Sequence, residues 1–165
     1  MGRYPLPSLA PALTSVMPDR PETANALARA ARDEAAGDFA LARHRLKNYL
    51  HDRSDDLVAR RALAALYRID GYPDEAGRWG YLLPDGATER ERQAFERSCA
   101  HRMPPLWRYT SVRRGLRWHQ PVEEAPEEVR EVLLRLDLAA ARERAEWDRM
   151  TTPLTVRLRR WLLRR

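Results

Sequence analysis

Cysteine, lysine and long apolar runs are scarce in this chain of 165 residues. Cys99 is its only cysteine, so no disulfide can form within the chain, which fits a reducing cytoplasm. No apolar run approaches the roughly 18 residues that a membrane-spanning helix requires, and we expect no such helix. Prolines interrupt the mildly apolar N-terminus, so we expect no signal peptide either. The sequence therefore predicts a cytoplasmic protein.

Familiar catalytic signatures are also missing. The sequence contains no glycine-rich phosphate loop, no HExxH or CxxC pair and no G-x-S-x-G elbow. His44 and His51 are seven residues apart and could share a helix face, but a closed metal site needs further ligands. Cys99 has no identifiable base beside it, so we expect a small buried side chain and not a nucleophile. We expect neither an enzyme nor a bound cofactor or metal.

The main positive feature is a pattern that is written twice between residues 23 and 83. Its period is 34 residues, and a period of this length is typical of helical repeat proteins. The recurring pairs are Gly37 and Gly71, Ala30 and Ala64, and Ala42 and Ala76. Apolar residues at helical spacing surround each glycine, so each copy predicts two short amphipathic helices.

Local signals predict where these helices begin and end. Gly37 and Gly71 can adopt the left-handed conformation that ends a helix without steric cost. Asp38 and the stretch 54–56 supply side chains that can cap the following helices. Pro73 stands where a first-turn proline loses no hydrogen bond.

The spacing resembles the tetratricopeptide repeat. The residues at the positions of that repeat's pattern are Ala30 and Ala42 in the first copy and Leu63, Ala64, Tyr67 and Ala76 in the second. Residues 36–83, with the run EAGRWGYLL at 75–83, also resemble a family of uncharacterised small proteins from high-GC Gram-positive bacteria. That second resemblance implies no activity.

The tetratricopeptide resemblance implies a non-catalytic adaptor whose protein or peptide partner binds the concave side formed by the first helix of each repeat. On this side it places Leu27, Ala31, Glu34 and Ala35 from the first copy and Val58, Arg61, Ala65, Arg68 and Ile69 from the second. Arg61 and Arg68 are the expected polar anchors for an acidic or C-terminal peptide. The lysine and asparagine set of chaperone-binding repeats is missing, so that class of partner is not expected.

A third helix is predicted after the repeats. Thr88 and Glu91 form a capping box that opens it. Its apolar side, with Phe95 and Cys99, is expected to pack on the previous repeat, while its outer face meets water. This helix would close the stack.

Residues 102–121 interleave aromatic side chains with five arginines and contain no acid. The segment could form a hairpin around Gly115, with Trp107 and Tyr109 on one strand and Trp118 on the other. Arginines and aromatic rings together suit single-stranded nucleic acid. The alternative is that the tryptophans anchor a connection to the core and the arginines face solvent or the acidic helix that follows. Lys47 is the only lysine, which indicates a GC-rich coding bias and weakens any argument from arginine abundance.

Two helices are predicted at the C-terminus. The first begins at Pro126, ends near Met150 and is long enough to span both repeats; it either completes the core or mediates a homodimer. Its apolar stripe is Val129, Val132, Leu133, Leu136, Ala140 and Trp147. The spacing of residues 152–165 predicts a basic amphipathic helix. Such a helix could pack on the core of its own domain, rest on an anionic membrane surface, enter an acidic groove or contact nucleic acid. The alternative patch for an anionic partner is Arg108, Arg113, Arg114, Arg117, Arg157, Arg160 and Arg164.

The predicted fold class is thus all-α. We expect a short tetratricopeptide-like solenoid of two repeats plus a capping helix, followed by a long C-terminal helix and a terminal basic amphipathic helix. The expected organisation is a Pro-rich arm (1–21), a repeat core (22–101), a basic aromatic connector (102–121) and C-terminal helices (122–165). A protein or peptide partner is expected, with nucleic acid as the alternative.

Overall fold

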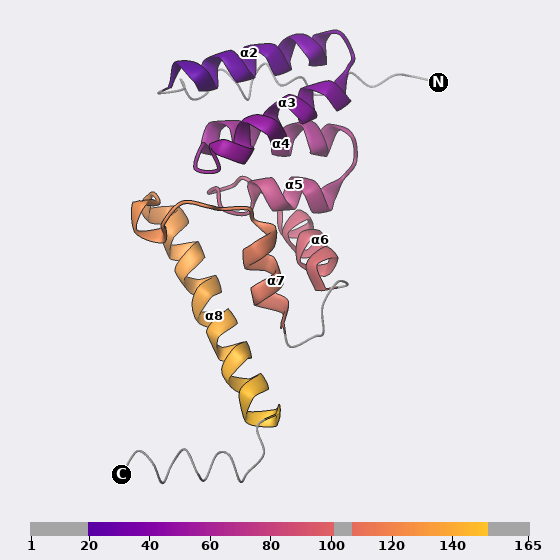
Figure 1. The fold of residues 1–165 in the computed structure, drawn as a ribbon. Helices are drawn as coiled ribbons and strands as arrows, with labels where there is room; N and C mark the ends of the chain where they lie inside the picture. Colours follow the sequence, from indigo (N-terminus) through magenta and orange to yellow (C-terminus); the bar gives the residue numbers. More distant parts are fainter. Residues whose placement is uncertain (1–19, 101–106, 152–165) are drawn as a thin grey trace.

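Every regular element in the described part of the chain is a helix, so the all-α prediction is confirmed. The computed structural model describes residues 20–100 and 107–151; the predicted N-terminal arm and the basic helix of residues 152–165 lie essentially outside this range. In chain order the helices are α2 (Pro21–Ala35), α3 (Phe39–Asp52), α4 (Leu57–Ile69), α5 (Pro73–Gly80), α6 (Glu89–Ala100), α7 (Arg108–Gly115), the 3-10 helix η2 (Val122–Glu124) and α8 (Glu127–Thr151) (Figure 1).

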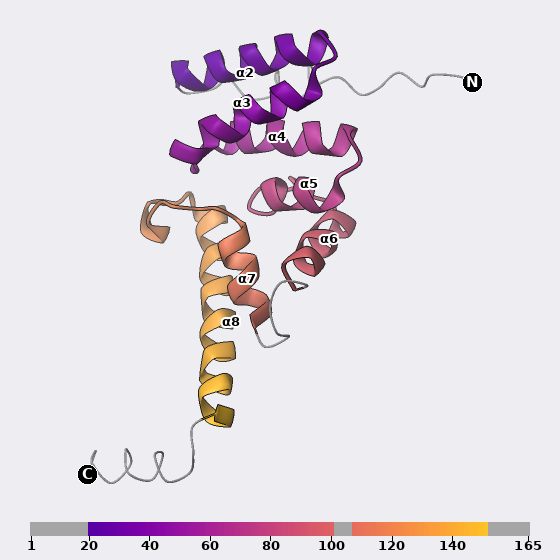
Figure 2. The same ribbon diagram turned by 45° about the vertical axis from the view of Figure 1, so that its right-hand side comes forward.

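The first helices pack one on the next. α2 packs on α3, α3 on α4, α4 on α5 and α5 on α6, and α2 also contacts α4 directly. Figures 1 and 2 show α2 to α5 in successive layers, with α6 below them. The helices therefore lie in space in the order in which they occur in the sequence.

The two copies of the repeat end their first helices in the same way. Gly37 and Gly71 have φ angles of 81° and 76°, as the sequence predicts. The Gly37 N–H donates to the Glu34 carbonyl at 2.8 Å, and the Asp38 N–H donates to the Asp33 carbonyl at 2.8 Å. In the second copy, the Gly71 N–H donates to the Arg68 carbonyl at 3.2 Å, and the Tyr72 N–H donates to the Tyr67 carbonyl at 2.9 Å. This pair of bonds satisfies the last carbonyls of each helix.

Two clusters of buried side chains form the core. The first belongs to α2 to α5 and contains both members of the alanine pairs that recur after 34 residues; it comprises Leu27, Ala30, Ala42, Leu46, Leu50, Ala59, Ala62, Leu63, Ala64, Leu66, Tyr67, Ala76 and Trp79. The second joins the end of α5 to α6, α7 and α8; it comprises Leu82, Phe95, Cys99, Val112, Leu116, Trp118, Ala125, Val129, Leu133 and Leu136. Burial of Cys99 is as predicted.

Helix α6 opens as predicted but does not close the stack. Its capping box forms, with the Thr88 N–H donating to Glu91 at 2.8 Å and the Glu91 N–H donating to the Thr88 hydroxyl at 3.3 Å. However, α6 packs on α7 as well as on α5. The two helices approach closely at Gly115, where a Cβ would lie 2.9 Å from Cζ of Phe95. This contact lies on the apolar side of α6, at Phe95 and Cys99, whereas Arg90 and Arg97 on its outer face are exposed, as the sequence predicts.

The predicted hairpin around Gly115 is also wrong, because residues 108–115 form helix α7. The N-terminal end of α7 is stabilised by Glu143 of α8. Its carboxylate accepts hydrogen bonds from the Tyr109 and Thr110 N–H groups at 2.8 and 3.1 Å. It thus satisfies free donors of the first turn and opposes the positive end of the helix dipole.

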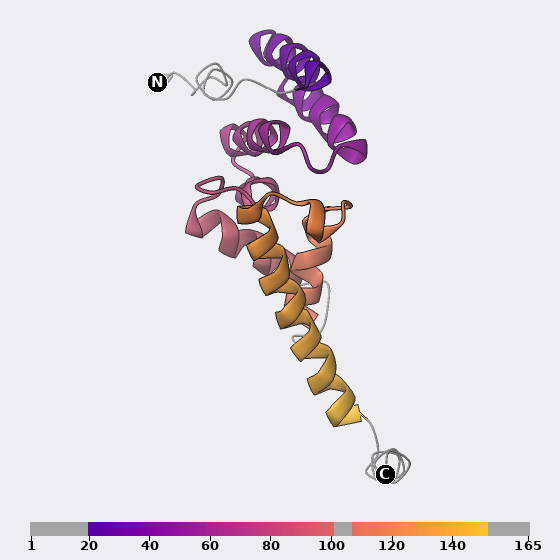
Figure 3. The same cartoon turned by 90° about the vertical axis from the view of Figure 1, so that its left-hand side faces the viewer.

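Helix α8 is long enough to span the two repeats but does not lie along them. It packs on α7 and η2, and Figures 1 and 3 show it running away from α2 and α3. Val129, Leu133, Leu136 and Ala140 are buried as its stripe predicts. Trp147 remains 37% exposed, and its ring centroid lies 6.0 Å from that of Trp107. The helix completes the second cluster and not the first.

The helix end at Gly71 provides a test of the repeat geometry. Gly71→Ala should lower the free energy of unfolding by about 1 kcal/mol, because alanine resists a positive φ while a Cβ there meets no atom within 4 Å. Gly71→Asn should cost less, since asparagine tolerates this conformation. Urea denaturation of both variants measures the difference, and equal losses would contradict the backbone explanation.

Candidate functional site

The face predicted for a partner lies on α2 and α4, which are in contact. Most of its side chains are half-buried: Ala31, Glu34, Val58, Arg61, Ala65 and Ile69. Leu27 is only 6% exposed and belongs to the first core cluster, and Ala35 is exposed. Leu27 packs inward because it follows Thr23 by four residues and precedes Ala30 by three on the buried side of α2. The face is therefore narrower than the sequence predicts.

The two arginines expected as anchors on this face differ in their hydrogen-bond partners. Arg68 donates to both oxygens of Glu91 at 2.5 and 2.8 Å, and also to the Gly86 carbonyl at 3.2 Å. The hydrogen bonds from Arg68 hold the pKa of the Glu91 carboxyl below its usual range. Arg61 makes one long bond, 3.5 Å, to the Pro84 carbonyl. Arg68 thus ties α4 to α6, and Arg61 is the cation that this face leaves without a carboxylate among the described residues.

The arginines of the alternative patch also fall into different groups. Arg108 pairs with Glu96, and Arg113 pairs with Asp137 at 3.0 Å. The acidic residues of α6 and α8 therefore neutralise part of the basic segment. The sequence alternative expects the pair with the following helix α8, and the pair with the preceding helix α6 was not predicted. Arg114 and Arg117 have no carboxylate partner within the described residues. Arg157, Arg160 and Arg164 lie outside the described part of the chain.

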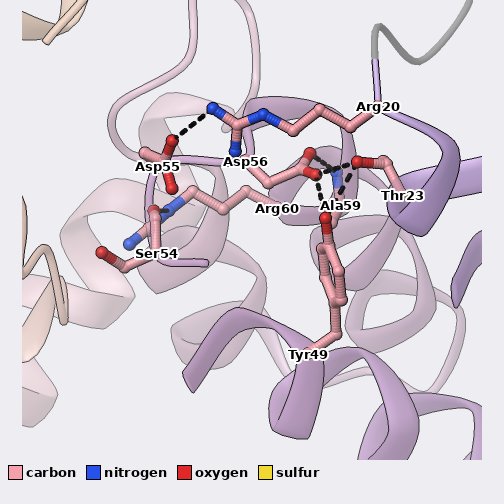
Figure 4. Close-up of polar contacts among 8 residues, drawn as sticks. All are labelled: Arg20, Thr23, Tyr49, Ser54, Asp55, Asp56, Ala59 and Arg60. Carbon is pink, nitrogen blue, oxygen red and sulfur yellow. Dashed lines mark hydrogen bonds and ion pairs between the residues drawn. The ribbon is translucent and has the colours of Figure 1, made fainter. Parts of the chain in front are cut away.

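A buried polar network joins the first three helices (Figure 4). Asp56, the N-cap of α4, accepts from the Ala59 N–H at 2.9 Å. Its other oxygen accepts from the Thr23 hydroxyl at 2.5 Å and from the Tyr49 hydroxyl at 2.7 Å. Burial is the main cause that raises the pKa of Tyr49, so its hydroxyl stays protonated at neutral pH. The network connects α2, α3 and α4 through one carboxylate.

Arg60 is the residue that sequence reasoning missed. Its side chain is fully buried, and the fold gives it backbone acceptors in place of a carboxylate. Its Nε donates to the Ser54 carbonyl at 2.7 Å, and Nη2 donates to the carbonyls of Leu116 and Arg117 at 2.9 and 3.1 Å. Burial lowers the pKa of Arg60 to about 10, which leaves it charged at neutral pH. The available signal was helical spacing, because Arg60 falls three residues before Leu63 on the apolar side of α4.

Two indole rings complete the environment of Arg60. Its Cζ lies 5.4 Å from the ring centroid of Trp79 and 5.6 Å from that of Trp118. Both distances fall within the range of cation–π attraction. Trp79 belongs to the first core cluster and Trp118 to the second, so this guanidinium lies where the two clusters meet.

Most of the chain matches one protein family. Residues 22–158 match DUF6584, a family of unknown function. The chain belongs to the DUF6584 family. The match includes the segment 36–83 and continues through α8. No curated protein and no solved structure matches the chain.

Pockets on this DUF6584 chain are small and open. One of about 340 Å³ lies between α2 and α3 and is lined by Glu22, Asn25, Ala26, Arg29, Arg45, Asn48 and Tyr49. Another of about 420 Å³ borders α6, α7 and α8, with Tyr81, Arg92, Glu96 and Arg135 among its lining residues. Across residues 20–100 and 107–151, no group of three or more histidine, cysteine or acidic side chains could hold a metal ion. No helix in those ranges is long and apolar enough to cross a membrane.

Arg60→Lys and Arg61→Lys form a matched pair in this DUF6584 protein. Arg60→Lys should lower the free energy of unfolding by about 2 kcal/mol, because one ammonium cannot replace a planar fork bonded to three carbonyls. Arg61→Lys should change it by less than about 0.5 kcal/mol. Chemical denaturation followed by circular dichroism measures both, and equal effects would contradict the role given to Arg60.

Proposed function

We propose that this chain is a non-catalytic interaction module that binds a partner protein or peptide on the face of α2 and α4. The observation that carries the proposal is the contrast among three arginines of α4. Arg60 and Arg68 use their guanidinium groups within the fold, whereas Arg61 has no carboxylate among the described residues. A half-buried cation with no carboxylate partner among the described residues is suited to an acidic group supplied by another molecule.

Small side chains beside Arg61 support the same use of this face. Ala31 of α2 and Ala65 of α4 are half-buried, and Val58 packs partly against the core cluster beneath. A partner backbone can approach small residues closely and bury apolar surface there. The stacking of short helix pairs is an architecture that presents such faces, as in tetratricopeptide-like solenoids. The expected partner is therefore an acidic segment of a protein, held by Arg61 and by contacts with the small residues.

Arg61→Glu should abolish capture of the partner without unfolding the chain. The reversed charge repels an acidic segment, and Arg61 lies outside the buried core. The measurement is affinity capture with the tagged full chain from its native lysate, with and without nuclease, followed by mass spectrometry.

Lys47→Glu is the matched control, because Lys47 is exposed on α3, a helix that contributes no residue to the proposed face. This variant should capture the same protein as the unmodified chain. Capture that survives Arg61→Glu counts against the face. Capture that disappears with nuclease assigns binding to nucleic acid and to the alternative arginine patch.

We also propose that α8 pairs with a second copy of the chain. Leu134 and Leu138 are 54% and 55% exposed, and Ala141 and Ala145 follow them on the same side of the helix. In an antiparallel pair Leu134 of one copy packs near Leu138 of the other. Glu131 of each copy then lies opposite Arg142 of its partner copy, since both residues flank the stripe on one side. The charges along this face are thus complementary between two antiparallel copies.

Sedimentation equilibrium tests this pairing. The unmodified chain should form a dimer, and Glu131→Arg should weaken it because arginines then face each other. Adding Arg142→Glu should restore the dimer by reversing the pair. A monomeric unmodified chain, or a dimer that ignores both substitutions, would show that α8 is not the interface.

A further inference from the structure

A pocket of about 290 Å³ lies between α5, α6 and α7. Its lining includes three arginines and two serines but no acidic residue: Arg78, Ser98, Cys99, Ser111, Arg114, Gly115 and Arg117. These residues come from three helices and from the segment that follows α7. The pocket is separate from the face of α2 and α4, so a ligand bound in it does not depend on the proposed partner site.

Arg78 is the most deeply placed of the three arginines, with its side chain 13% exposed. It pairs with Glu75 at 2.7 Å, and its Cζ lies 5.6 Å from the ring centroid of Phe95. Its Nε is buried and has no hydrogen-bond acceptor among the described residues. Glu75 offsets one positive charge, so three arginines and one glutamate leave a net charge of two positive at the pocket.

The two remaining charges belong to Arg114 and Arg117. Neither has a carboxylate partner in the ranges that the structure describes, whereas the adjacent Arg113 pairs with Asp137. The positive charges of arginines that line the same pocket repel one another. An anion bound between them would remove this repulsion.

The backbone at Arg117 is held in an uncommon conformation. Its φ angle is 50°, in the left-handed region that a bulky residue seldom occupies. The buried Arg60 donates to the carbonyls of Leu116 and Arg117 and so fixes this turn. The fold thereby places the Arg117 side chain at the pocket in a backbone conformation that a free chain avoids. Arg117 directly follows Leu116, the C-cap of α7, where a left-handed residue commonly ends a helix.

We propose that this pocket binds a phosphate dianion, either as free phosphate or as a phosphate monoester. Two negative charges match the net charge of the pocket, and guanidinium groups present paired N–H donors to phosphate oxygens. The Ser111 hydroxyl lines the same pocket and supplies a further donor. Gly115 keeps α7 close to α6, since a Cβ there would lie 3.1 Å from Sγ of Cys99.

Isothermal titration of the full chain tests the pocket. Inorganic phosphate and phosphoserine are titrated separately at pH about 7.5, where both are mainly dianions. Acetate at the same ionic strength controls for general screening. Combining Arg114→Gln with Arg117→Asn should weaken phosphate binding at least about tenfold. Asparagine tolerates the left-handed backbone of position 117, and Arg97→Gln on the exposed side of α6 should bind like the unmodified chain.

The outcomes are distinct. Tighter binding of phosphoserine identifies an esterified ligand, and tighter binding of inorganic phosphate identifies the free ion; either supports the pocket. Phosphate binding no tighter than acetate binding overturns the proposal. Phosphate binding that the double substitution leaves unchanged also overturns the proposal. If the double variant does not fold, Arg114→Gln alone, at an exposed position of α7, gives the same test.

Discussion

The burial of the Arg60 guanidinium is the interaction on which the arrangement of the helices depends. Removing a charged group from water costs several kcal/mol unless the protein replaces its hydration. Here three carbonyls and two indole faces replace most of that hydration, and Nη1 alone has no acceptor among the described residues. These groups come from α5, from the turn before α4 and from the segment after α7. The charge is stabilised only where these parts meet, so the contact determines how the two core clusters are joined.

The direction of α8 follows from the same contact. Arg60 holds the carbonyls of Leu116 and Arg117, and the Ser54 hydroxyl accepts from the His119 N–H at 3.0 Å. The segment that leads to α8 is therefore attached to the beginning of α4. From there α8 packs on α7 and extends away from α2 and α3 (Figure 3). Helix α8 therefore does not cover the face of α2 and α4.

The sequence predicts those features whose partners lie within a few residues. The helix ends at Gly37 and Gly71, the Asp56 cap and the Thr88 box of α6 are all of this kind. Helix α7 was not predictable in the same way, because the carboxylate that caps it, Glu143, lies more than 30 residues away. The candidate site shows the same limit. Local spacing places Arg61 and Arg68 on one face, but only the fold brings Glu91 to Arg68.

Arginine content alone therefore says little about recognition in this chain. Arg68, Arg108 and Arg113 are paired with acids of the same protein, and a partner would have to break those pairs to use them. Breaking a pair leaves its carboxylate without a partner, which offsets much of what a new contact gains. A partner would therefore gain more at arginines that have no carboxylate partner among the described residues. Arg61 lies on the helix stack, whereas Arg114 and Arg117 line a pocket beside α7, so the two proposed ligands would not compete for the same residues.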